Sequence, residues 1–93
     1  MTTIVGIIKE IGALEQIRRT SKPDIFKRLV TILQEDGQVF YGEIRNNNIK
    51  ILEREGLEIG DEVIVDIIFQ GNEKDGKKYN NILIHSVKRL SKE

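Results

Sequence analysis

The chain has 93 residues, with 15 Lys or Arg against 15 Asp or Glu, so its formal net charge is zero. This length predicts a single domain over residues 1–93 and excludes an eightfold β/α barrel or a complete dinucleotide-binding domain. The chain has no cysteine, which excludes disulfides and cysteine-bound zinc, and no run near the roughly 18 apolar residues of a membrane helix. We therefore expect a cytoplasmic protein with no membrane partner, and the thin core of so short a chain favours a homo-oligomer.

The first strand is predicted over residues 3–17, which begin with an apolar, β-rich run. Gly6 and Gly12 interrupt it, and glycines within a strand mark bulges or bends at a barrel corner. We therefore expect one long, sharply curved strand. Pro23 follows in a polar stretch, which predicts a loop because proline disfavours helix before it.

The second strand is predicted over residues 25–33. Neither of its faces is cleanly polar. The alternation therefore leaves open whether Phe26 and Arg28 or Lys27 and Leu29 face a ligand.

The third strand, over residues 39–45, follows an Asp-Gly pair that is typical of a hairpin turn. Its more polar face carries Tyr41, which we expect to point outward, and Phe40 is expected in the core. Three asparagines then predict a helix start over residues 46–48, because asparagine is a good N-cap. Gly56 and the leucine after it predict a left-handed C-terminal cap.

The fourth strand has one face that is predicted to be core, and this face holds Val63, Val65, Ile67 and Phe69. Its other face includes Ile64 and Ile68, for which a subunit contact and burial within this chain are both open. The Asp75-Gly76 turn leads to a last strand over residues 79–87 and a short charged tail over 88–93.

The order of elements is three strands, a helix and two strands. This is the arrangement of the OB-fold, an all-β, five-stranded Greek-key barrel with a short helix between strands 3 and 4. Barrel closure would help a small chain to cover its sheet edges.

A family resemblance rests on two stretches: Leu-Glu-Ile-Gly-Asp-Glu-Val-Ile-Val over residues 57–65 and Asn-Glu-Lys-Asp-Gly-Lys-Lys-Tyr-Asn-Asn-Ile over 72–82. They resemble the fourth strand, hairpin and fifth strand of bacterial and phage single-stranded-DNA-binding proteins, including related small bacterial OB domains. Gly6 and the aromatic-basic-basic stretch 26–28 resemble the family's first two strands. The chain departs from the family in having no Trp and in ending without the acidic tip of its long members. The resemblance implies an OB-fold and single-stranded DNA as the partner.

Binding to a single strand needs cations for the backbone and flat side chains for the bases. On an OB barrel the ligand lies across strands 2 and 3, flanked by the loops between strands 1 and 2 and between strands 4 and 5. Cations are concentrated at these places, although the whole chain is neutral, and acids gather around the helix end. The candidate nucleic-acid-binding residues are Arg18, Arg19, Lys22, Phe26, Lys27, Arg28, Tyr41, Lys74, Lys77, Lys78 and Tyr79.

The prediction is therefore a non-enzymatic protein that binds single-stranded DNA, with RNA also possible, in replication, recombination or repair. Loop cations would capture the strand, and bases would stack on Phe26 and Tyr41. No catalytic, cofactor or metal site is predicted, since His85 and the acids of strand 4 fit ordinary strand and turn positions. Two alternatives are open: a protein-interaction OB domain without nucleic acid, and a swapped-hairpin regulator that binds duplex DNA.

Overall fold

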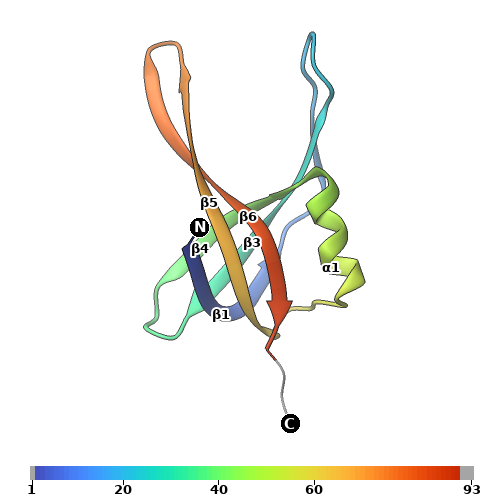
Figure 1. Cartoon of the computed structure of the whole chain (residues 1–93), viewed down its shortest axis with the longest axis vertical. Helices are drawn as coiled ribbons and strands as arrows, with labels where there is room; N and C mark the ends of the chain where they lie inside the picture. Colours follow the sequence, from blue (N-terminus) through green and yellow to red (C-terminus); the bar gives the residue numbers. More distant parts are fainter. Residues whose placement is uncertain (1, 91–93) are drawn as a thin grey trace.

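The computed structural model describes residues 2–90, with the side chain of Lys74 left out of the description (Figure 1). Its elements are β1 (Thr2–Ile11), β2 (Glu15–Ile17), β3 (Ile25–Gln34), β4 (Val39–Arg45), the 3₁₀ helix η1 (Asn46–Ile49), α1 (Lys50–Arg54), β5 (Glu62–Lys74) and β6 (Lys77–Arg89). No helix in residues 2–90 is long and apolar enough to cross a membrane.

Five strands close into a ring in the order β1, β5, β6, β4 and β3, and the pairing of β3 with β1 completes it. All these pairs are antiparallel except β4 with β6, which meet in parallel at Glu43 and Leu83. The short β2 pairs with β3 outside the ring. In chain order, β4 and β5 are the third and fourth of the five ring strands, and η1 and α1 lie between them. The predicted all-β OB-fold is therefore confirmed.

Closure depends on β1, whose middle pairs with β5 on one side and β3 on the other. Gly6 is buried at this point, opposite both Val63 and Gln34. A Cβ there would lie 2.5 Å from the carbonyl oxygen of Leu33, so the approach of the two strands requires glycine. The ring encloses an apolar core that includes Ile8, Val30, Ile32, Phe40, Ile44, Val63, Val65, Ile67, Ile84 and Val87.

The first strand differs from its prediction, because β1 ends at Ile11 and Glu15–Ile17 forms a separate strand. At the break, the N–H of Gly12 donates to the carbonyl of Leu29 at 2.7 Å. This bond keeps the chain on β3 while it leaves the ring. One long curved strand over 3–17 was therefore the wrong expectation, and the glycine marks an interruption.

The helix begins at the predicted asparagines, but their side chains do not cap it. Asn46 has a positive φ of 52°, and its Oδ1 accepts the N–H of Phe26 at 3.1 Å. At the other end the prediction is confirmed. Gly56 has φ 61°, its N–H donates to the carbonyl of Glu53, and the N–H of Leu57 donates to that of Leu52, which is the Schellman pattern.

The outer halves of β5 and β6 leave the barrel as a hairpin arm, drawn in orange in Figure 1. Its turn has φ 55° at Asp75 and 79° at Gly76, which fits a two-residue turn of type I′. Phe69 was expected in the core and is instead 58% exposed. It lies on the same face as the buried Ile67, but it is near the end of the core, where its partner Ile82 is itself only partly buried.

The C-terminal part of the chain also differs in extent from the predicted tail. β6 continues through Lys88 and Arg89, and Arg89 forms an ion pair with Asp61 at 3.0 Å. Residues 91–93 lie outside the described part of the chain.

Candidate nucleic-acid interface

The alternation of β3 shows which of its residues point outward. Val30 and Ile32 are in the core, so Phe26 and Arg28 belong to the core side of the strand. Lys27 and Leu29 lie on the outer side. The alternation of the sequence left open which pair faces outward. In the structure it is Lys27 and Leu29 that lie on the outside of the barrel.

The outer side of β3 continues across β4 because directly paired residues share a face. Lys27 pairs with Arg45, and Thr31 pairs with Tyr41, which is 59% exposed as expected for an outward tyrosine. Glu43 pairs with Leu83 and so carries the surface on to β6 and its partner β5. We name this surface the outer strip, and it contains Lys27, Leu29, Tyr41, Glu43, Arg45, Leu83, Ile68, Asn81 and Tyr79.

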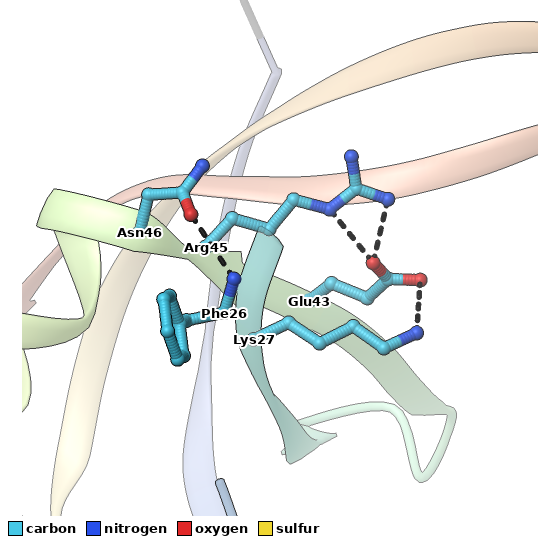
Figure 2. A network of polar contacts seen from close by, with 5 residues as sticks. All are labelled: Phe26, Lys27, Glu43, Arg45 and Asn46. Carbon is cyan, nitrogen blue, oxygen red and sulfur yellow. Dashed lines mark hydrogen bonds and ion pairs between the residues drawn. The ribbon is translucent and has the colours of Figure 1, made fainter. Parts of the chain in front are cut away.

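The centre of the outer strip is a cluster of three charged side chains (Figure 2). Arg45 places its Nε and Nη2 at 2.9 and 2.8 Å from Oε1 of Glu43. Lys27 places its Nζ 3.7 Å from Oε2 of the same carboxylate. The three side chains are 19–24% exposed, so the cluster remains accessible from outside the barrel.

A second arm is formed by the loop between β2 and β3, and it projects from the same end of the barrel as the β5–β6 arm (Figure 1). Arg18 and Lys22 are exposed in this loop. Arg19 donates from Nε and Nη2 to the carbonyl oxygen of Pro23, at 2.9 and 2.7 Å. That guanidinium closes the loop on itself, and three of its N–H groups are not used in the two bonds.

The β5–β6 arm carries the other predicted cations. Lys77 and Lys78 are exposed, and as neighbours in a strand they point to opposite faces. Lys77 alternates with Tyr79, which is 45% exposed, and so belongs on the side of the outer strip. Lys74 is paired with Lys77 in the backbone register, but the prediction for its side chain lies outside the described part.

Two of the predicted residues on β3 lie away from the outer strip. Arg28 is half-buried, and its Nε donates to the carbonyl of Gly12 at 2.7 Å. Phe26 is partly exposed and pairs with Gln16 of β2, on the core side of β3. The structure therefore does not bring Phe26 and Tyr41 onto one stacking surface.

Sequence reasoning missed Arg45 as a candidate, although it noted the polar alternation of the third strand. The signal was present in the spacing, because Tyr41, Glu43 and Arg45 are two residues apart. What could not be seen was the pairing of Arg45 with Lys27, which depends on strand register.

Searches found no protein-family model and no curated protein sequence that matches the chain. Among solved structures, the chain is similar in fold to the N-terminal domain of PriB protein from Thermoanaerobacter tencongensis, described as dimeric. The identity is 15%, the TM-score is 0.52, and the match covers 98% of this chain and 96% of the other. A small single-stranded DNA-binding protein from Streptomyces coelicolor also matches, at 11% identity, a TM-score of 0.46, and 96% and 92% coverage. At 15% identity the likeness to the PriB domain concerns the fold alone, and it agrees with the OB-fold derived from strand order.

Proposed function

We propose that this protein binds single-stranded DNA along the outer strip, without sequence readout and without catalysis. The observation that carries the proposal is that two exposed tyrosines, Tyr41 and Tyr79, lie on the outer strip. Lys27 and Arg45 lie on the same strip, which runs from β3 across β4 to β6. An exposed aromatic ring offers a face to any base, and cations beside it can neutralise the phosphates.

The two arms support the same proposal through their charge. Arg18, Arg19 and Lys22 outnumber Asp24 in one arm, and in the sequence of the other arm three lysines outnumber Glu73 and Asp75. The turn between β3 and β4, which holds Glu35 and Asp36, is at the opposite end of the barrel (Figure 1). A neutral chain with this distribution attracts a polyanion to the end that bears the arms. Stacking on Phe26 stays a separate prediction, because Phe26 lies outside the strip.

We further propose that the protein is a homo-oligomer that associates through an apolar row at the arm-free end. Ile7 of β1 is paired with Leu33 of β3, and Leu33 is paired with Val39 of β4. Ile7 and Val39 are exposed, and Ile7 and Leu33 line a shallow hollow of about 290 Å³. Within residues 2–90, Thr2–Val5 are paired on the β5 side alone, which leaves an edge that a second copy can extend antiparallel.

A specific observation also favours the protein-interaction alternative. Lys27 is already neutralised in part by Glu43, and the same barrel wall exposes Leu29 and Val39. A partner protein could cover this wall without using the cations of the arms. Under this alternative, Tyr41 would contact protein and nucleic acid would not bind.

The deciding experiment is a titration of the full chain into a labelled oligo-dT and into a duplex of equal length, followed by fluorescence anisotropy. We expect binding to the single strand that weakens with salt, since phosphate contacts release counterions. Failure to bind oligo-dT at low salt would reject the proposal, and a preference for duplex would favour the regulator. Light scattering on the same samples tests the oligomer, and Val39→Lys should shift it towards monomer.

A further inference from the structure

Lys27 and Arg45 face each other directly across the β3–β4 ladder, on the outer strip. Like charges at directly opposed positions destabilise a sheet, so this pair needs an anion nearby. Glu43 supplies it, because its two carboxylate oxygens take one cation each (Figure 2). Counting formal charges, two cations and one anion leave the cluster at +1.

The cluster has more donors than Glu43 can use. The guanidinium of Arg45 has five N–H groups, of which the two bonds to Oε1 use two, and the Lys27 ammonium has three. The carboxylate therefore occupies the position that suits another oxyanion, between a forked guanidinium and an ammonium. A phosphate group has the same acceptor chemistry, and Tyr41 lies two residues from Glu43 on the same face.

We propose that Lys27 and Arg45 form a phosphate-binding pair and that Glu43 is a built-in competitor for it. A backbone phosphate of the bound strand takes the place of the carboxylate on one or both cations. In the protein without nucleic acid, Glu43 reduces the repulsion between the two cations. In the complex, it competes with the phosphate and so lowers the affinity for nucleic acid. This inference rests on the proposed binding of single-stranded DNA and adds a residue that sets its strength.

The test compares Glu43→Gln with Glu55→Gln in the anisotropy titration with oligo-dT. Both variants remove one negative charge, but Glu55 is exposed at the end of α1, away from the strip. We expect Glu43→Gln to lower Kd roughly two- to fivefold, the scale of released surface ion pairs, and Glu55→Gln to lower it far less. The slope of log Kd against log salt should steepen by about 0.7 for each phosphate that is newly neutralised.

Two further variants keep the test decisive. Glu43→Gln combined with Arg45→Gln should lose the gain in affinity, because the site for the phosphate is then incomplete. Glu43→Asp retains the charge on a shorter side chain and should give a Kd between those of the wild type and Glu43→Gln. This variant replaces Glu43→Gln in the test if a thermal melt shows that Glu43→Gln is unfolded.

The outcomes separate the two proposals. Wild-type binding with equal effects of Glu43→Gln and Glu55→Gln overturns the competitor role and leaves the proposed function intact. Absence of binding by the wild type and by Glu43→Gln overturns both. Binding by Glu43→Gln alone rejects the proposed function of the natural chain, while it supports Lys27 and Arg45 as a phosphate-binding pair that Glu43 blocks.

Discussion

Arg28 donates its Nε–H to the carbonyl oxygen of Gly12 at 2.7 Å, and this bond ties β3 to the point where β1 ends. The side chain is half-buried on the core side of β3. We expect Arg28→Ala to lower the free energy of unfolding by about 1.5–3 kcal/mol, the range for a hydrogen bond to a charged group. Urea unfolding would measure it, with the exposed Arg18→Ala as the control. An unchanged midpoint for Arg28→Ala would show that the bond is dispensable.

Tyr41 is the aromatic residue of the outer strip with the largest exposed fraction. We expect Tyr41→Ala to weaken binding to oligo-dT by about 1–3 kcal/mol, since that is the scale of stacking one base on an aromatic side chain. Tyr41→Phe should retain binding, because the ring and not the hydroxyl is used. Phe26→Ala should weaken binding less, as Phe26 lies on the other side of β3. Equal losses for Tyr41→Ala and Phe26→Ala would argue against the strip as the path of the strand.

Gly6 has no room for a side chain where β1 meets both of its partners. A Cβ would lie 2.5 Å from the Leu33 carbonyl oxygen and 2.6 Å from Cγ2 of Ile32, so the backbones would have to separate. We expect Gly6→Ala to cost about 1–3 kcal/mol in the free energy of unfolding, the usual cost of overpacking. Gly71→Ala is the matched control, because its Cβ would meet the nearest atom at an ordinary 3.6 Å. Similar unfolding curves for the two variants would contradict this account of barrel closure.

Asp66 accepts hydrogen bonds from Oγ1 of Thr3 at 2.8 Å and Oγ of Ser86 at 2.9 Å. These bonds, ahead of the nearby positive charges, hold the pKa of Asp66 below its usual value, although desolvation acts in the opposite direction. A lowered pKa in the folded state stabilises the protein above the unfolded pKa of about 3.9. This contribution disappears as the pH falls through the folded pKa.

The pH dependence of urea unfolding tests the role of Asp66. Between neutral pH and the acid limit of folding, Asp66→Asn should show a shallower loss of stability than the wild type. Glu35→Gln, at an exposed turn position, should follow the wild type. Parallel curves for Asp66→Asn and the wild type would mean that other carboxyl groups account for the acid sensitivity.

Features that depend only on neighbouring residues could be predicted from the sequence. The turn at Asp75 and Gly76 follows from two residues that tolerate positive φ, and the cap at Gly56 follows from the same property one position after the helix. The order of strands around the helix was enough to predict the OB-fold. It could not reveal that the first segment breaks at Gly12, because a bend and an interruption both use glycine.

The surfaces that these strands present depend instead on how the whole barrel packs. Phe69 has the alternation of a core residue and is nevertheless exposed, because β5 continues past the end of the ring. The alternation of apolar residues along a strand does not show where the ring ends. Lys27, Glu43 and Arg45 form one cluster because strand register brings residues 18 positions apart in the chain directly opposite each other. Periodicity is a local property of the chain, whereas register and barrel length are set by the packing of all five ring strands together.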